Sequence, residues 1–147
     1  MKLGLYMRLA KTVGQESTCP RANTGAVIVL DDRVVSLGYN GAPRKIPHCK
    51  DEGCWLFVKG QRTHCFRAVH AELNALLSAA YHGARTKGAL LFCTHSPCLE
   101  CLKACINAGI SQIMYKEAYD DSLTQDLYIL CKDILITRYE EDANEAL

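Results

Sequence analysis

Two kinds of apolar pattern alternate along the chain from His70 onwards. Segments with apolar residues three and four positions apart are typical of helices, and short runs rich in Leu, Ile and Val are typical of buried strands. The predicted order is helix His70–His82, strand Ala89–Thr94, helix Pro97–Ala108, strand Ile110–Lys116, helix Ser122–Lys132 and strand Ile134–Thr137. This alternation of strands and helices restricts the chain to an α/β fold.

The first part of the chain adds one helix and two strands. Residues Met1–Gly14 have helical spacing and end at a glycine. Ala26–Leu30 and Arg33–Gly38 flank a turn and are predicted to form a hairpin. Gly41–Cys65 lacks periodicity and gathers prolines and glycines, so we predict a long loop of the kind that is usually functional. The sum is a three-layer α/β/α domain over residues 1–147 with a mixed sheet of about five strands, and only residues 140–147 are expected to fray.

Size and charge exclude several kinds of partner. A chain of 147 residues can bury a core without disulfides. Its 17 basic and 16 acidic residues give a net charge of +1, which leaves no surplus of basic residues for binding long nucleic acid. No apolar run approaches the ~20 residues that span a bilayer, and the amino-terminal stretch has no signal-peptide core. We therefore expect a cytoplasmic protein with neither a membrane nor long nucleic acid as partner.

Nine cysteines are unusual for such a chain. Cytoplasmic proteins rarely form disulfides, and an odd number of cysteines cannot all pair within one chain. Metal binding is therefore the leading interpretation for most of them. Cys93 lies in an apolar run and Cys131 in a predicted helix, so these two are expected to pack as small apolar residues.

Two short motifs lie at predicted helix starts. His70-Ala-Glu72 opens one helix, and Pro97-Cys98-Leu-Glu-Cys101 opens the next. Two cysteines three apart at a helix start can direct both sulfurs at one ion, and the local dipole favours the thiolate form. With His70 as third ligand, one tetrahedral position stays open for water, as in catalytic zinc sites. Glu72 can then accept a proton from that water and pass it to a ring nitrogen and a departing amine.

Two other interpretations of these motifs remain. A zinc ribbon with some other fourth ligand would leave Glu72 as a solvated helix residue, and a redox dithiol would use Cys98 and Cys101 alone. Neither requires His-x-Glu to precede Pro-Cys-x-x-Cys. That order is the pattern of zinc-dependent nucleobase deaminases.

The chain resembles the cytidine and deoxycytidylate deaminase superfamily, and most closely its deoxycytidylate (dCMP) deaminase branch, from about Gly4 to Thr137. The resemblance is carried by the two motifs and by the segments Cys19–Val29, Gly38–Pro43, Ala68–Ala75 and Asn107–Ile110. It implies a five-stranded sheet between helices and zinc-dependent hydrolysis of dCMP to dUMP and ammonia. It also implies a homo-oligomer, often a hexamer, and regulation by dCTP and dTTP.

The resemblance further suggests how the substrate is held. Asn40 would bind the sugar or phosphate, and the backbone N–H of Ala71, with Thr94 nearby, would contact the pyrimidine carbonyl edge. Arg21, Arg67 and Tyr119 are candidates for the 5′-phosphate, because a monophosphate needs charged or phenolic donors. Alternatively, Arg67 is a surface cation and Tyr119 packs its ring under a strand end.

The remaining cysteines suggest a second metal site. Cys19, Cys49, Cys54 and Cys65 are enough to hold a structural zinc that pins the 41–65 segment to the first helix, an arrangement that resembles several dCMP deaminases. His64 is an alternative to Cys65 as fourth ligand, and we choose Cys65. Otherwise the four are ordinary reduced cysteines.

Other functions share the metal motifs. A cytidine, guanine or tRNA adenosine deaminase would carry the same ligands and glutamate, although the near-neutral charge argues against tRNA. From a different class, the chain could be a non-catalytic zinc module that senses a nucleotide.

Overall fold

The computed structural model describes residues 1–119 and 122–141, and most of the carboxyl-terminal stretch expected to fray lies outside them. Five strands form one sheet in the order β2-β1-β5-β6-β7. β1 pairs antiparallel with β2 and β5, whereas β5, β6 and β7 run parallel. The predicted mixed five-stranded sheet is confirmed. The strands are β1 Gly25–Leu30, β2 Arg33–Tyr39, β5 Leu90–His95, β6 Gln112–Glu117 and β7 Leu135–Arg138.

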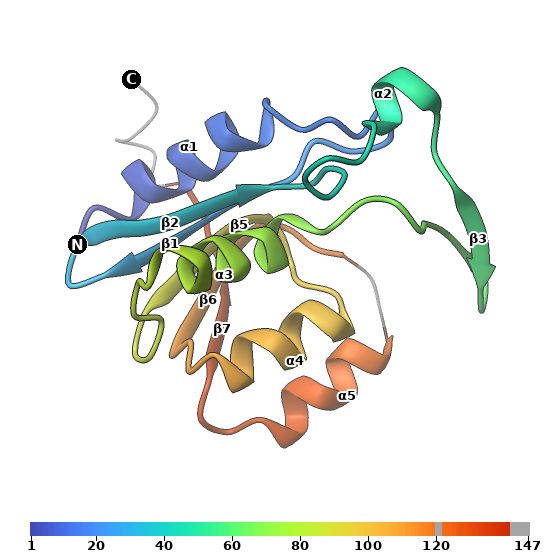
Figure 1. Cartoon of the computed structure of the whole chain (residues 1–147). Helices are drawn as coiled ribbons and strands as arrows, with labels where there is room; N and C mark the ends of the chain where they lie inside the picture. Colours follow the sequence, from blue (N-terminus) through green and yellow to red (C-terminus); the bar gives the residue numbers. More distant parts are fainter. Residues whose placement is uncertain (120–121, 142–147) are drawn as a thin grey trace.

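Helices cover both faces of this sheet (Figure 1). α1, Leu3–Gly14, lies on one face, and the other face carries α3, Ala71–His82, α4, Leu99–Asn107, and α5, Ser122–Leu130. Alternate residues of β1 supply the two cores, because successive strand side chains point to opposite faces. Val27 and Val29 pack with α1, and Ala26 and Ile28 pack with α3 and α4.

α3 lies unusually close to β2, and a glycine makes this possible. A Cβ on Gly38 would lie 2.5 Å from the carbonyl oxygen of Ala71 and closer still to the backbone nitrogen of Ala75. The hydroxyl of Ser36 donates to the carbonyl of Ala75 at 2.6 Å and fixes the same contact. The first turns of α3, where His70 and Glu72 lie, are therefore held against the sheet.

The segment 41–65 differs from the predicted loop. It contains the short helix α2, Cys49–Glu52, and a separate antiparallel pair, β3 Leu56–Lys59 and β4 Arg62–Cys65. We call β3 and β4 with their connecting turn the β3–β4 hairpin, which stands out from the domain in Figure 1. The apolar run 55–58 before Gly60 was its signal in the sequence. The prolines, cysteines and glycines around that run are typical of a loop, so no strand was predicted there.

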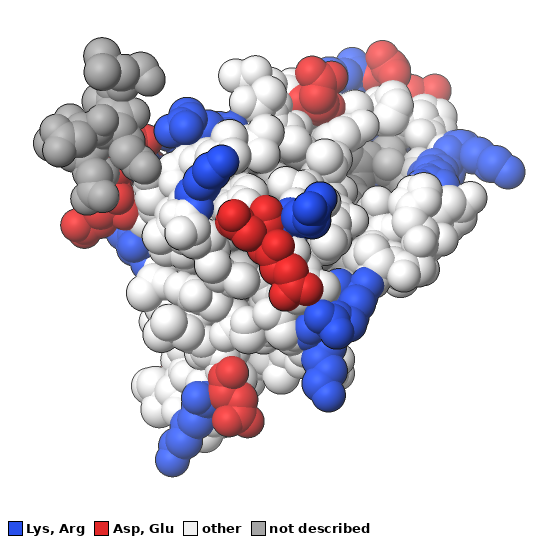
Figure 2. Space-filling view, turned by 90° about the vertical axis from the view of Figure 1, so that its left-hand side faces the viewer, with Lys and Arg blue, Asp and Glu red and all other residues white. Residues whose placement is uncertain are grey.

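The described residues include no helix with the length and apolar character needed to cross a membrane. On the face shown in Figure 2, basic and acidic side chains are interspersed among uncharged residues, in keeping with the near balance of charges in the sequence. Of the two cysteines expected to pack as apolar residues, Cys93 is fully buried and Cys131 is partly buried against the core beneath α5.

Candidate metal centre and its cavity

Two helix starts bring the predicted ligands together. His70 is the N-cap residue of α3 and Cys98 that of α4, and neither side chain makes a capping hydrogen bond. Both have extended backbone dihedrals, and their side chains meet, as the contact between Cys98 Sγ and His70 Nδ1 shows. Cys101 lies in the first turn of α4 and is buried. The unpaired N–H groups and positive dipole ends of both helices face this cluster and favour thiolates.

The spacing of the three donor atoms fits a zinc ion. His70 Nδ1 lies 3.4 Å from Cys98 Sγ and 3.5 Å from Cys101 Sγ, and all three atoms lie within 4.8 Å of one another. Tetrahedral bonds of about 2.0 Å to nitrogen and about 2.3 Å to sulfur separate such donors by roughly 3.6 Å. The donor set of one imidazole and two thiols therefore has both the chemistry and the separation that zinc requires.

Electrostatic interactions within the cluster favour the thiolate form of Cys98. Hydrogen bonds from Cys101 and then from His70 lower the pKa of the Cys98 thiol to about 4. The same hydrogen bond to Cys98 raises the pKa of His70 above its usual value. One thiolate is thus stabilised even without an ion, and a cation can take the place of the shared proton.

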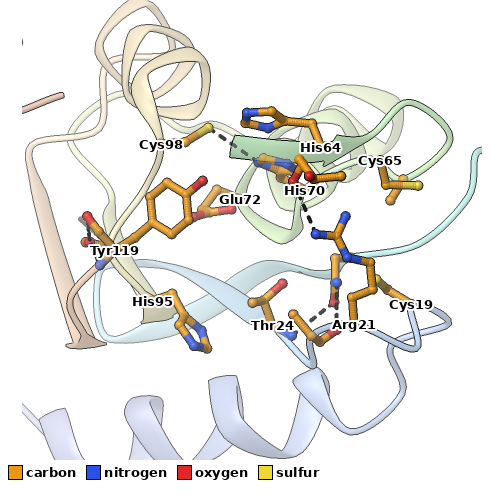
Figure 3. Close-up of a pocket in the computed structure, with 15 residues that line it drawn as sticks. Cys19, Arg21, Thr24, His64, Cys65, His70, Glu72, His95, Cys98 and Tyr119 are labelled. Atoms are coloured by element: carbon orange, nitrogen blue, oxygen red, sulfur yellow. Dashed lines mark hydrogen bonds between the residues drawn. The ribbon is translucent and has the colours of Figure 1, made fainter. Parts of the chain in front are cut away.

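Glu72 lies beside this cluster in the first turn of α3. Its side chain is buried, and burial raises the pKa of its carboxyl group. Glu72 nevertheless lines the cavity, where Figure 3 shows its carboxylate between Tyr119 and His70. A carboxyl group with a raised pKa that faces a cavity is suited to holding and releasing a proton.

The cavity has a volume of about 270 Å³ and opens beside the metal cluster (Figure 3). Its walls come from the loop after α1, the ends of β2 and β5, the segment after β6, the β3–β4 hairpin, and the starts of α3 and α4. The lining residues are Cys19, Arg21, Ala22, Thr24, Asn40, Thr63, His64, Cys65, Ala68, His70, Glu72, His95, Ser96, Cys98 and Tyr119.

Three of the predicted substrate contacts line the cavity, namely Asn40, Arg21 and Tyr119. The Asn40 amide also stabilises the loop after α1 that forms part of the wall. Its Oδ1 accepts from Thr24 N–H at 3.0 Å, and its Nδ2 donates to Ala22 O at 2.8 Å. Asn40 therefore shapes the cavity as well as facing it.

Ala71, Thr94 and Arg67 are buried and are not among the lining residues. The Thr94 hydroxyl accepts from the N–H of Gly25 at 3.1 Å, which ties β5 to β1. Arg67 donates from Nη1 to Pro47 O at 2.8 Å, and its guanidinium lies 4.6 Å from the centre of the Trp55 ring. Arg67 is thus neither a surface cation nor a wall residue.

Five lining residues have side chains that can hydrogen-bond and were not predicted as substrate contacts. His95 and Ser96 directly precede Pro97, so their position next to the cysteine motif could have indicated them. Thr24 lies between Arg21 and β1, inside a segment that was already singled out. Thr63 and His64 belong to the β3–β4 hairpin, whose position against the cavity the sequence did not indicate.

A second cluster joins three thiols, those of Cys49, Cys54 and Cys65, within 4.8 Å of one another. Burial alone would raise the pKa of Cys65, but N–H groups of the backbone, from Ala68 and Arg67 among others, donate to its sulfur and hold that pKa below its usual value. Cys65 belongs to this cluster, as chosen, whereas His64 is not among its members and lines the cavity. The structure does not place Cys19 within the same 4.8 Å group, and Cys19 also lines the cavity.

Fold and site together define a class, that of α/β domains with a metal-binding centre at two adjacent helix starts. The model of the family described as the cytidine and deoxycytidylate deaminase zinc-binding region matches residues 2–117. The chain belongs to this family of deaminases. Membership accounts for the zinc-type donor set and confirms the family identified from the sequence.

Several relatives are similar over most of the chain. ComE operon protein 2 of Bacillus subtilis is 42% identical over 114 residues, which make up 78% of this chain and 58% of that protein. The deoxycytidylate deaminase of Enterobacteria phage T4 is 33% identical over 154 residues and covers 82% of this chain and 80% of its own length. This chain thus spans little more than half of the first protein but most of the second.

Solved structures also resemble the chain, to different degrees. The dCMP deaminase of cyanophage S-TIM5, in complex with dCMP and dUMP, superposes with a TM-score of 0.77 at 28% identity and covers 92% of this chain and 95% of its own. The guanine deaminase of Nitrosomonas europaea shares only the fold, with 14% identity and a TM-score of 0.53.

Proposed function

We propose that this chain hydrolyses dCMP to dUMP and ammonia, with residues 1–147 acting as one deaminase domain. The observation that carries the proposal is a His-Cys-Cys cluster open to a cavity that the buried carboxylate of Glu72 also faces. The named activity of the phage T4 relative and the nucleotides bound to the cyanophage S-TIM5 structure favour dCMP among the family's substrates.

His70, Cys98 and Cys101 would hold the zinc ion, which supplies activation of a water molecule for attack on the amino-bearing ring carbon. Glu72 accepts a proton from that water, because it is the carboxylate nearest the cluster among the lining residues. Glu72 then delivers this proton to the ring nitrogen. A second proton, taken by Glu72 from the hydroxyl added to the ring carbon, passes to the amine, which leaves as ammonia when its bond to that carbon breaks. Burial keeps bulk water from exchanging with this proton during the transfer.

The cavity is suited to a small substrate. A volume of about 270 Å³ lies near the lower end of small-molecule sites, which suits a single base or small nucleotide. Asn40 would hold the sugar or phosphate, and Arg21 and Tyr119 remain candidates for the 5′-phosphate. The backbone N–H of Ala71, with Thr94 nearby, would contact the pyrimidine carbonyl edge, and Arg67 is the third candidate for the 5′-phosphate.

A structural zinc in the second cluster belongs to the same proposal. Three thiols that lie together, one of them receiving backbone N–H donors, are typical of a thiolate metal site. Cys19 would have to move closer to become the fourth ligand. Metal analysis tests this: about two zinc ions per chain support the second site, and one per chain in fully active protein contradicts it.

Ultraviolet absorbance and ammonia release test the activity directly. The zinc-loaded protein is assayed with dCMP, dCTP, deoxycytidine, guanine and a tRNA adenosine substrate. We expect conversion of dCMP to dUMP at the highest kcat/KM. Preference for another substrate would assign a different deaminase activity to the same metal centre. Unchanged absorbance with every substrate would instead favour a nucleotide-binding zinc module.

The oligomer, often a hexamer, and the regulation by dCTP and dTTP stay predictions from the family resemblance. Sedimentation of the full chain tests the first. Initial rates of dCMP turnover with and without each triphosphate test the second.

A further inference from the structure

His95 is the last residue of β5, where this strand reaches the cavity. It pairs with Glu117 of β6, and the N–H of the next residue, Ser96, donates to the carbonyl of Glu117 at 2.8 Å. Pairing with β6 therefore continues past His95 and holds its backbone in place. The side chain is half-buried and lines the cavity. A side chain on a rigid element is well suited to binding a ligand in one defined position.

A chain of hydrogen bonds determines which ring nitrogen of His95 carries the hydrogen. The hydroxyl oxygen of Thr94 accepts from the N–H of Gly25 at 3.1 Å and lies 3.0 Å from His95 Nδ1. A backbone N–H can only donate, so the Thr94 hydroxyl keeps its own hydrogen and donates it to Nδ1. In the neutral imidazole, Nδ1 is therefore the acceptor and Nε2 carries the hydrogen.

The N–H at Nε2 is available to a ligand. Nδ1 lies near the backbone, whereas Nε2 is at the outer end of the side chain. Within residues 1–119 and 122–141, the structure shows no hydrogen-bond partner for Nε2. Because His95 lines the cavity, a molecule bound there can accept from this N–H. The hydrogen bond from Thr94 fixes the tautomer in advance, so binding requires little reorganisation of the ring.

The position of His95 relative to the metal cluster indicates which part of a substrate it would meet. In cytosine the amino-bearing carbon lies directly across the ring from the nitrogen that carries the sugar. A base whose amino-bearing carbon faces the metal therefore directs its sugar away from the metal. In the view of Figure 3, the carboxylate of Glu72 lies between Cys98 on one side and His95 on the other. His95 thus lies on the side of the cavity where the sugar would be.

A neutral N–H donor suits a hydroxyl group of that sugar. In dCMP the 5′ oxygen is esterified and the 2′ carbon carries no oxygen, so the 3′-hydroxyl is the free hydroxyl that remains. A hydroxyl oxygen can accept from an imidazole N–H. Asn40, which is also expected to contact the sugar or phosphate, uses part of its amide to bind Thr24 and Ala22. A further donor to the sugar is therefore needed, and His95 supplies it.

We propose that His95 donates from Nε2 to the 3′-hydroxyl of the substrate's sugar, and that Thr94 is the positioning residue that holds the imidazole in the tautomer required. This inference rests on the proposed deaminase function and adds a substrate-binding residue to it. It also gives the pair Gly25 and Thr94, which joins β1 to β5, a role in orienting that residue.

The test distinguishes the two nitrogens of the ring. His95→Asn keeps a polar group near the position of Nδ1 but removes the donor at Nε2, whereas His95→Gln can place an N–H near Nε2. kcat and KM are measured with dCMP and with 2′,3′-dideoxycytidine 5′-monophosphate, which lacks the 3′-hydroxyl. The ratio of kcat/KM for dCMP over that for the dideoxy analogue should be about two- to tenfold lower in His95→Asn than in the wild type, as expected for one neutral hydrogen bond. His95→Gln should lie closer to the wild-type ratio.

Most of the change should appear in KM for dCMP, because a hydroxyl remote from the reacting carbon is bound equally in ground and transition states. His82→Asn is the matched control, since His82 is exposed at the end of α3 and should leave the ratio unchanged. A residue that only supported the fold would affect both substrates alike. A wild-type ratio in His95→Asn would therefore overturn the inference.

Two measurements test His95 without turnover. Nitrogen-15 NMR at a pH where the ring is neutral distinguishes the tautomers, and the signals of His95 are those that His95→Asn lacks. Hydrogen on Nε2 is expected, and hydrogen on Nδ1 would overturn the inference. Should the wild type not deaminate dCMP, the proposed function fails. Calorimetric Kd values for dUMP and its 3′-deoxy analogue then test the contact alone: their ratio should differ between wild type and His95→Asn, and equal ratios or no binding would contradict the contact.

Discussion

Replacing Gly38 with alanine tests whether the contact between β2 and α3 positions the metal centre. The added methyl carbon would lie 2.5 Å from Ala71 O and 2.9 Å from the carbonyl carbon of Asn74, whereas ordinary contact begins at 3.4 Å. These neighbours are helix backbone, which cannot rotate away as a side chain can. The first turns of α3 must therefore shift by about 1 Å or the strand must bend.

The expected cost follows from this misfit. Overpacking of a tightly packed interior costs about 1–3 kcal/mol of unfolding free energy. For a chain of this size each 1 kcal/mol lowers Tm by about 2–4 °C, so Gly38→Ala should melt roughly 2–12 °C below the wild type. Because the first turn of α3 also carries Glu72, a displacement of about 1 Å should lower kcat for dCMP by on the order of a hundredfold.

Thermal unfolding and dCMP turnover of the zinc-loaded protein measure both effects. Leu37→Ala serves as the control, because this neighbouring side chain is 47% exposed and its loss should change the unfolding free energy by about 0.5 kcal/mol or less. If Gly38→Ala melted with the wild type and turned over dCMP at the wild-type rate, the close approach of α3 to β2 could not be what positions Glu72.

Three further predictions concern the metal sites and the core. Glu72→Gln should lower kcat for dCMP by about 10²–10⁴-fold while metal analysis still finds the His70-Cys98-Cys101 zinc, and wild-type turnover would contradict the proton-transfer role. Cys54→Ser should reduce bound zinc from about two ions per chain to about one, with Cys131→Ser as control, and an unchanged count would exclude Cys54 as a ligand. Leu102→Ala, at a fully buried position of α4, should lower the unfolding free energy by about 2–5 kcal/mol in denaturant titrations, and a loss below 1 kcal/mol would contradict its place in the core.

The elements of the main sheet could be predicted from the sequence because each is encoded locally. Helical spacing and short apolar runs gave every helix and strand of the layers to within a few residues, including α3 and β5. The metal ligands were predictable for the same reason, since His70 and Cys98 each lie in a short motif at a helix start. The family model matching residues 2–117 confirms that interpretation of the chain as a deaminase.

The walls of the cavity were less predictable because they depend on contacts between distant segments. Arg21 reaches Thr63 and Arg62 reaches Tyr119, so separate parts of the chain meet at the rim. No pattern within a short stretch of sequence indicates which distant residues will make such contacts. Arg67 is a phosphate candidate because of its charge, but its contacts with Pro47 and Trp55 could not be predicted from the sequence.

The projecting hairpin also has a consequence for how such an enzyme could change its substrate. Gly60 lies in the tight turn at the hairpin tip, where its φ of 65° favours glycine. Sequence changes elsewhere in the hairpin, or replacement of the whole β-ribbon, would leave the buried layers beneath α3 and α4 untouched. Catalytic machinery and substrate choice could then diversify on separate parts of the same small domain.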